Sequence, residues 1–116
     1  MPAATRGGFR PDHRITRRTE FEAVYTRGTR HEGRFMTVFV LPTDRPVARL
    51  GIAATRRLGG AVRRNRAKRL VREVFRTSDA PSGRDIVVRP RPELLDAEFA
   101  SLEADYRATL NRRRRR

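Results

Sequence analysis

The segment of residues 59–76, GGAVRRNRAKRLVREVFR, constrains the fold most strongly because it combines helical apolar spacing with dense positive charge. Its apolar residues recur at i, i+3, i+4, i+7 and i+8 on one face of a helix: Ala67, Leu70, Val71, Val74 and Phe75. The opposite face carries Asn65, Arg69, Arg72 and Arg76. The pattern predicts a helix that packs on a core and presents guanidinium groups outward. Such planar, permanently charged groups suit phosphate oxygens and base edges, so the helix is predicted to lie on a polyanion.

The charge of the whole chain supports the same interpretation. Its 116 residues include 28 Lys and Arg against 13 Asp and Glu, which gives a formal net charge of +15. A chain of this length is expected to form one domain, and its charge repels itself in the compact state. An anionic partner is therefore expected, and the clustering of the basic residues favours nucleic acid.

The composition also excludes several classes of protein. The chain has no cysteine, which excludes disulfides, thiolate nucleophiles and cysteine-based metal sites. No apolar run approaches the roughly 20 residues that span a bilayer, and the first residues lack the apolar centre of a secretory signal. We therefore expect a cytoplasmic protein without a membrane partner.

The sequence offers no catalytic site. His13 and His31 have no partner at ligand spacing, and the acidic residues gather in the C-terminal third, where a solvated helix face accounts for them. Gly59 and Gly60 are not followed by the Gly-Lys-Ser/Thr of a phosphate-binding loop. We expect no catalytic residue and assign no metal ligand.

A short helix is predicted to begin at Thr19. Thr19 and Glu22 fit a capping box, and Gly28 is expected to close the helix in a left-handed conformation. One face of this helix carries Phe21, Val24 and Tyr25. From the residues alone, core packing of Phe21 and Tyr25 is favoured over stacking on RNA.

Three later segments are predicted to be strands. Residues 35–41 and 47–55 are apolar and β-branched, and the turn between them predicts a hairpin with a loop of about five residues. Residues 85–89 form a compact third strand, whereas the sequence does not decide whether residues 30–34 are extended or irregular. A closing helix from about residue 96 has an amphipathic stripe that is expected to pack on the core: Phe99, Leu102, Tyr106 and Leu110.

These elements predict an α+β fold, a single-domain sandwich of a small central β-sheet with packed helices in the order α-β-β-(β)-α-β-α. The domain is expected at residues 14–111. A flexible arm is expected at residues 1–13, which lack periodicity, and a basic tail at residues 112–116, which are all arginine.

The basic segment and its surroundings resemble the protein component of bacterial ribonuclease P. The family's motif A-V-x-R-N-R-x-K-R-x-x-R is matched by Ala61, Val62, Arg64, Asn65, Arg66, Lys68, Arg69 and Arg72. It is preceded by a helix with two spaced aromatics and by a G-[ILV]-x-x-[ST]-[KR]-[KR]-[ILV]-G segment at residues 51–59. A D-[IV]-[IV] strand follows at residues 85–88. Gly60 departs from the polar residue of many relatives, so a side-chain contact is lost there.

The resemblance implies a noncatalytic RNA-binding subunit whose partners are the ribonuclease P catalytic RNA and the 5′ leader of precursor tRNA. Mg²⁺ is expected mainly on that RNA, no protein partner is implied, and the motif helix is expected on a left-handed β-α-β crossover. The residues expected to bind the RNA subunit are Arg63, Arg64, Asn65, Arg66, Lys68, Arg69 and Arg72. Those expected in the leader-binding cleft are Phe21, Tyr25, Phe35, Thr37, Phe39, Arg56 and Arg57.

Several alternatives stay open. The cleft would take one of two alternating sets: Phe35, Thr37 and Phe39, or Met36, Val38 and Val40. A ribosomal protein or general RNA chaperone would share the charge without a leader cleft. A DNA-binding regulator would need a helix-turn-helix partner, and an autonomous nuclease would need an acid or ligand cluster.

Overall fold

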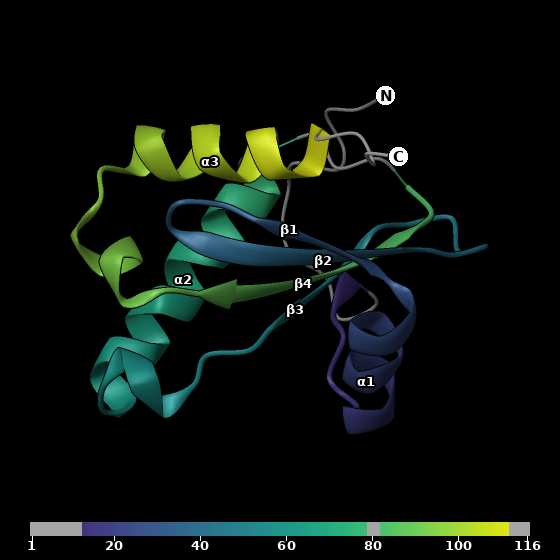
Figure 1. Cartoon of the computed structure of the whole chain (residues 1–116), viewed down its shortest axis with the longest axis horizontal. Helices are drawn as coiled ribbons and strands as arrows, with labels where there is room; N and C mark the ends of the chain where they lie inside the picture. Colours follow the sequence, from purple (N-terminus) through teal and green to yellow (C-terminus); the bar gives the residue numbers. More distant parts are fainter. Residues whose placement is uncertain (1–12, 79–81, 112–116) are drawn as a thin grey trace.

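The computed structural model describes residues 13–78 and 82–111, which form one mixed four-stranded sheet with helices on both faces (Figure 1). The elements are α1 (Arg18–Arg27), β1 (Thr29–Glu32), β2 (Met36–Pro42), β3 (Arg49–Ile52), η3 (Arg56–Leu58), α2 (Ala61–Thr77), β4 (Arg84–Pro90), η4 (Pro92–Asp96) and α3 (Phe99–Asn111), where η3 and η4 are short 3-10 helices. The α+β class and the order of elements are those predicted, with β1 as the undecided strand. The predicted tail, and the predicted arm apart from His13, lie outside the described residues.

The strand order β1-β2-β4-β3 contradicts the predicted hairpin. β2 pairs with β4 in the antiparallel sense along its full length, and β3 pairs with the other side of β4 in the parallel sense. The pairing of residues 35–41 with residues 47–55 is therefore wrong. The physical reason lies in β4, where Ile86, Val87 and Val88 are all fully buried. A strand that is apolar on both faces buries most surface between two neighbours, at the centre of a sheet.

β3, α2 and β4 form a β-α-β unit, because parallel neighbours cannot be joined by a tight turn. The chain enters α2 through Gly59, whose φ of 120° favours glycine. A Cβ atom at Gly59 would also lie 2.6 Å from the side chain of Arg63. The two glycines thus precede the basic helix as predicted, while the left-handed sense of the crossover stays a prediction.

The predicted N-cap of α1 is wrong, whereas Gly28 is its C-cap as predicted but in a different conformation. The helix begins at Arg18 without a side-chain cap, so Thr19 lies inside its first turn, and Glu22 pairs with Arg18 instead, at 3.3 Å. Gly28 has a φ of −83° and is extended rather than left-handed. Glycine is required there because a Cβ atom would lie 2.5 Å from the carbonyl oxygen of Val24.

The other boundaries shift by small amounts. β2 begins at Met36 because the backbone N–H of Phe35 donates to the carboxylate of Asp105 on α3, at 2.9 Å. β3 is shorter than predicted, since its ladder with β4 covers only Arg49–Ile52. The closing helix begins at Phe99, after the separate turn η4.

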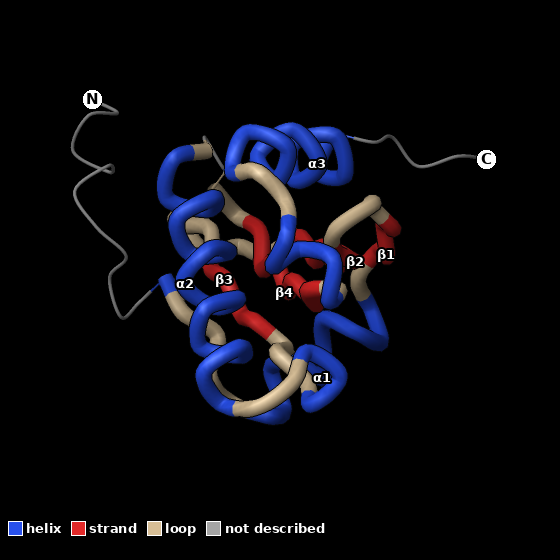
Figure 2. Tube along the Cα trace, turned by 90° about the vertical axis from the view of Figure 1, so that its left-hand side faces the viewer, coloured by secondary structure: helices blue, strands red, loops and turns tan. Residues whose placement is uncertain are grey.

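The sheet separates two apolar clusters, and Figure 2 shows α1 and α3 on opposite sides of it. The larger cluster joins the sheet to α2, η4 and α3, and on β2 it takes Met36, Val38 and Val40. The smaller cluster lies under α1 and consists of Ile15, Val24, Phe39 and Val87. The alternation of β2 therefore places Phe39 on the α1 side of the sheet and Met36 on the other side.

Candidate nucleic-acid interface

α2 has the two faces that its sequence predicts. Ala67, Val71, Val74 and Phe75 are buried in the larger cluster, and Leu70 is partly buried beside them. On the outer side Asn65, Arg66, Arg69 and Arg72 are exposed, while Arg64 and Lys68 are half-buried along its flank. We call these last six residues the α2 basic face.

The charge of the α2 basic face is not neutralised by the protein. In the part of the chain that the structure describes, its five cationic side chains make no hydrogen bond or ion pair. Arg76 differs, because its hydrogen bond to Glu73 neutralises it and raises its pKa. Arg63, also predicted to bind RNA, is partly used within the fold, since its Nε donates to the carbonyl oxygen of Leu58 at 2.6 Å.

On the other face of the sheet, α1 and β2 bring three aromatic rings together. Tyr25 meets Phe39 edge to face with 4.9 Å between ring centroids, and Phe21 lies 6.4 Å from Tyr25. Gly51 makes room for Phe21, because a Cβ atom there would lie 2.8 Å from the ring. Phe21 and Tyr25 are half-buried against the smaller cluster, so each ring packs on the core and keeps an exposed part.

Three residues predicted for the cleft on β2 have different environments. Phe39 and Thr37 are only 5% and 4% exposed. Phe35 packs against the larger cluster, so the structure does not bring it to the rings of α1. The hydrogen bond from its backbone to Asp105 holds Phe35 outside β2, where the strand alternation no longer sets its direction.

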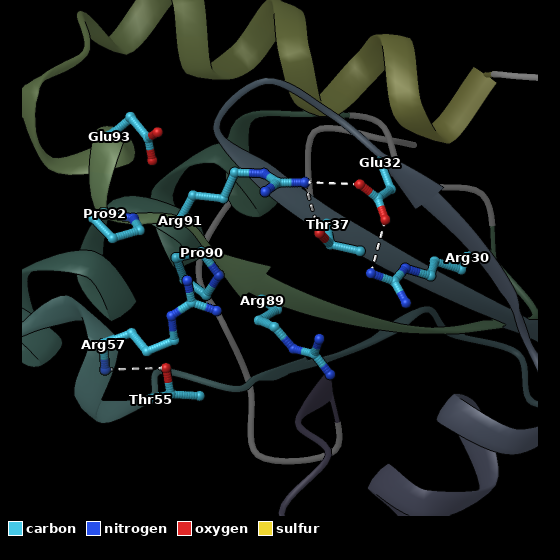
Figure 3. A pocket seen from close by; sticks show the side chains of 10 residues that line it. All are labelled: Arg30, Glu32, Thr37, Thr55, Arg57, Arg89, Pro90, Arg91, Pro92 and Glu93. Carbon is cyan, nitrogen blue, oxygen red and sulfur yellow. Dashed lines mark hydrogen bonds and ion pairs between the residues drawn. The ribbon is translucent and has the colours of Figure 1, made fainter.

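A pocket of about 340 Å³, shown in Figure 3, adjoins the rings through Arg89, which lines the pocket and contacts Tyr25 and Phe39. Its charged lining comes from β1, η3, β4, the N-cap of η4 and η4 itself, and consists of Arg30, Glu32, Arg57, Arg89, Arg91 and Glu93. The predicted Arg57 thus lies in the pocket, whereas Arg56 is exposed on η3 outside this lining. We call the three rings and this pocket together the sheet groove.

The cations of the pocket divide into two kinds. Arg30 and Arg91 both bind the carboxylate of Glu32, at 2.7 and 3.0 Å, as Figure 3 shows. Arg57 and Arg89 have no carboxylate partner among the described residues. The pocket therefore keeps positive charge for an external anion.

Arg89 connects the pocket to the rings and was not among the residues predicted for the cleft. Its guanidinium carbon lies 5.5 Å from the ring centroid of Tyr25 and 5.2 Å from that of Phe39, within the range of a cation–π contact. The sequence does show that Arg89 directly follows the apolar run of residues 86–88, and a charged residue at that place is the signal that could have identified it. Only the register of β2 with β4 shows that this arginine shares a face with Phe39.

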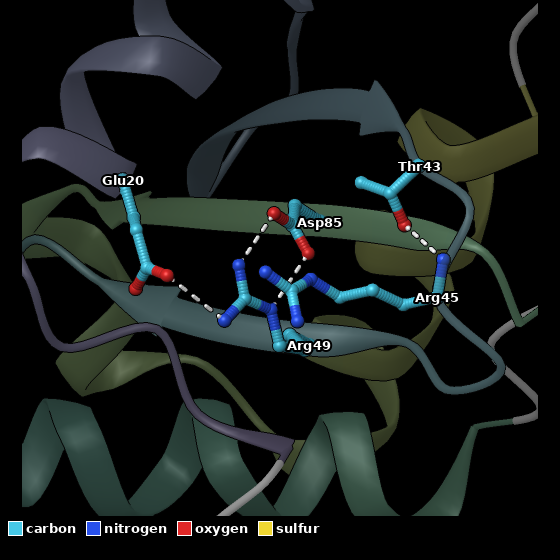
Figure 4. A network of polar contacts seen from close by, with 5 residues as sticks. All are labelled: Glu20, Thr43, Arg45, Arg49 and Asp85. Carbon is cyan, nitrogen blue, oxygen red and sulfur yellow. Dashed lines mark hydrogen bonds and ion pairs between the residues drawn. The ribbon is translucent and has the colours of Figure 1, made fainter.

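A buried ion-pair network fixes α1 to the sheet (Figure 4). Arg49 on β3 donates to both carboxylate oxygens of Asp85 on β4, at 2.9 and 2.8 Å, and to Glu20 on α1 at 3.1 Å. The hydrogen bond to Asp85, more than that to Glu20, raises the pKa of Arg49 against the effect of burial. This network was not predicted from the sequence, although a carboxylate at the start of an apolar strand indicates a paired partner.

In residues 13–78 and 82–111, no three His, Cys, Asp or Glu side chains are grouped to hold a metal ion. No helix in this part of the chain is long and apolar enough to cross a bilayer.

Comparisons with known proteins agree with one another. The family Ribonuclease P matches residues 9–114. The chain is 45% identical to the ribonuclease P protein component of Oleidesulfovibrio alaskensis, over 70% of this chain and 68% of that one. It is 38% identical to that of Acidothermus cellulolyticus, over 86% and 87%. The solved RNase P protein from Thermotoga maritima has a TM-score of 0.77 and 32% identity, over 87% of this chain and 97% of that one. The Staphylococcus aureus RNase P protein has a TM-score of 0.74 and 28% identity, over 84% and 92%.

Proposed function

The chain belongs to the ribonuclease P protein family, and on this premise we propose that it is the RNA-binding subunit that assists a catalytic RNA in removing the 5′ leader of precursor tRNA. The RNA subunit performs the hydrolysis in this proposal, and the protein supplies no catalytic residue. Its partners are the RNA subunit and the leader, and its place of action is the bacterial cytoplasm.

The observation that carries the proposal is the uncompensated charge of the α2 basic face. A folded RNA presents an array of phosphates, and arginine forks bind phosphate oxygens in pairs. Arg66, Arg69 and Arg72 are exposed on a helix whose other side is anchored in the core, so the backbone that carries them is fixed before binding. Such a rigid support reduces the entropy lost on association with RNA. Asn65 adds an amide that both donates and accepts hydrogen bonds.

The sheet groove is proposed to take the single-stranded leader. Proteins bind single strands through stacking platforms and a cationic channel. Phe21 and Tyr25 offer the partly exposed rings, and Arg57 offers a cation without a carboxylate partner in the described chain. Because α2 and the groove lie on opposite faces of the sheet, the two RNA contacts do not compete for one surface.

Mg²⁺ is proposed to bind mainly to the RNA subunit. The protein would favour Mg²⁺ and substrate binding there by reducing the repulsion between the phosphates of two RNA molecules. If it neutralises about 6–10 phosphates, affinity should fall by roughly 10³–10⁵ between 50 and 200 mM salt. Added Mg²⁺ should partly replace the protein, because both offset the same repulsion.

The test is processing of precursor tRNA with the protein, with a bacterial ribonuclease P RNA, and with both. We expect cleavage at low Mg²⁺ only when both are present, and tighter binding of precursor than of mature tRNA. Cleavage by the protein alone would support an autonomous nuclease instead. No effect on cleavage, with equal binding to unrelated RNAs, would support a general RNA-binding protein.

A further inference from the structure

We propose that Arg89 binds the leader directly, by holding one leader phosphate where the rings and the pocket of the sheet groove meet. This inference rests on the proposed function and adds to it a residue outside the family motif. Arg89 projects from β4, the strand between β2 and β3, and lines the pocket while it contacts two of the rings.

The ring of Phe39 is covered by cations, so a leader base does not reach its face in this structure. Phe39 is 5% exposed, and the guanidinium carbons of Arg89 and Arg30 lie 5.2 and 5.7 Å from its centroid. A cation–π contact occupies one face of a guanidinium group and leaves the N–H donors at its edge for other acceptors. At this point of the groove the leader therefore meets an oriented arginine fork.

The charge of Arg89 is available for an anion. Arg30 and Arg91 share the carboxylate of Glu32, whereas Arg89 has no carboxylate partner in residues 13–78 and 82–111. Arg89 is also half-buried, and a charge partly withdrawn from water attracts an opposite charge more strongly than an exposed one. The two rings hold its side chain in place, so little freedom is lost when a ligand binds.

A phosphate is the leader group that this arrangement suits best. Arginine binds phosphate through two parallel N–H bonds, and every leader nucleotide carries a phosphate whatever its base. Arg89 is therefore expected to strengthen leader binding without selecting a leader sequence.

The test uses the protein assembled with a bacterial ribonuclease P RNA, and precursor tRNAs in which one leader phosphate at a time is an uncharged methylphosphonate. For the wild type we expect a loss of about tenfold in affinity at one position, as for one charged hydrogen-bonded contact. Arg89→Gln should bind unmodified precursor about tenfold more weakly and lose nothing further at that position. For Arg89→Gln, the slope of log affinity against log salt concentration should fall in magnitude by about 0.7, the value for one phosphate of a single strand.

Matched variants separate this role from a folding defect. Arg84→Gln removes an arginine from the same strand outside the pocket lining and should bind like the wild type. Arg89→Lys keeps the charge and should retain more affinity than Arg89→Gln. Circular dichroism and binding of mature tRNA, expected to be unchanged, show whether each variant is folded.

Three results would overturn the assignment of Arg89: Arg89→Gln binding precursor as tightly as the wild type, losing equally on mature tRNA, or keeping the full methylphosphonate penalty. A wild-type assembly that does not distinguish precursor from mature tRNA would instead remove the proposed leader role, and this inference with it.

Discussion

Arg49 and Asp85 face each other across the parallel strands β3 and β4, with both carboxylate oxygens bound by one guanidinium group at 2.9 and 2.8 Å. Both residues are buried, at 8% and 5% exposure. The third contact of Arg49, to Glu20, reaches from the sheet to the helix that carries Phe21. One ion-pair network thus joins the edge strand, the central strand and the α1 wall of the sheet groove.

Arg49→Ala is expected to lower the free energy of unfolding by about 3–5 kcal/mol, because it leaves the carboxylate of Asp85 buried without a partner. Urea denaturation followed by circular dichroism measures this change. Arg49→Met combined with Asp85→Leu should recover most of the loss, since neither charge is then left buried. Glu20→Ala should cost at most about 1 kcal/mol, because its side chain is partly exposed. A loss from Arg49→Ala no larger than that from Glu20→Ala would contradict this account.

The sequence predicts the helices and strands of this fold better than it predicts their arrangement. Helical and strand periodicities are local, so α2 and the apolar centre of β4 follow from residues close together in the chain. The position of β4 between β2 and β3 depends instead on burial of Val87 on one face and of Val88 on the other, against residues distant in sequence. The choice of neighbours is a property of the whole sheet, and the local turn at residues 42–46 suggested the wrong one.

The same distinction applies to the candidate site. The α2 basic face could be predicted, because one helix determines which side chains share a side. The sheet groove could not be predicted in this way. It depends on the register that brings Arg89 beside Phe39, and on the packing that separates Phe35 from both residues. A four-residue pattern predicted a helical cap at Thr19. That prediction is wrong because α1 begins one residue earlier, at Arg18.

Tyr106→Phe is expected to raise the free energy of unfolding by about 1 kcal/mol, because it removes a polar group that is buried and unsatisfied. Tyr106 is fully buried, and its hydroxyl has no hydrogen-bond partner among the described residues. Burial also raises the pKa of this phenol. Chemical denaturation at neutral pH measures the first effect, and a variant less stable than the wild type would contradict it.

The raised pKa of Tyr106 predicts how the free energy of unfolding depends on pH. The phenol ionises near pH 10 in the unfolded chain, and burial raises its pKa in the folded chain. Below pH 10 the phenol is protonated in both states, so its contribution to the free energy of unfolding is fully present. Above pH 10 the unfolded state releases a proton that the native state keeps, and the free energy of unfolding falls by up to about 1.4 kcal/mol per pH unit. Denaturation of wild type and Tyr106→Phe at several pH values above 10 should show a shallower fall for the variant. Equal slopes would contradict the assignment to Tyr106.

Arg66→Ala combined with Arg69→Ala is expected to weaken assembly with the RNA subunit. Each exposed side chain should neutralise about one phosphate, so the slope of log affinity against log salt should fall by about 2 in total. Filter binding of the ribonuclease P RNA over a range of salt concentrations measures it. Arg45→Ala with Arg107→Ala removes the same charge from exposed residues outside α2 and is the matched control. Equal slopes for the two double variants would mean that net charge, rather than the α2 basic face, drives assembly.

Phe21→Ala is expected to weaken binding of precursor tRNA by about tenfold, the loss of one stacked base, while binding of mature tRNA stays nearly unchanged. Phe21→Tyr keeps a ring over Gly51 and should therefore keep the preference for precursor over mature tRNA that Phe21→Ala loses. Gly51→Ala should reproduce part of the defect with residue 21 unchanged, because its Cβ atom would lie 2.8 Å from the ring of Phe21 and displace it. Fluorescence anisotropy with labelled precursor and mature tRNA measures all three variants on the assembled ribonucleoprotein. Equal losses on both ligands would assign Phe21 to the core, and the leader would then have to be held by the cations of the sheet groove alone.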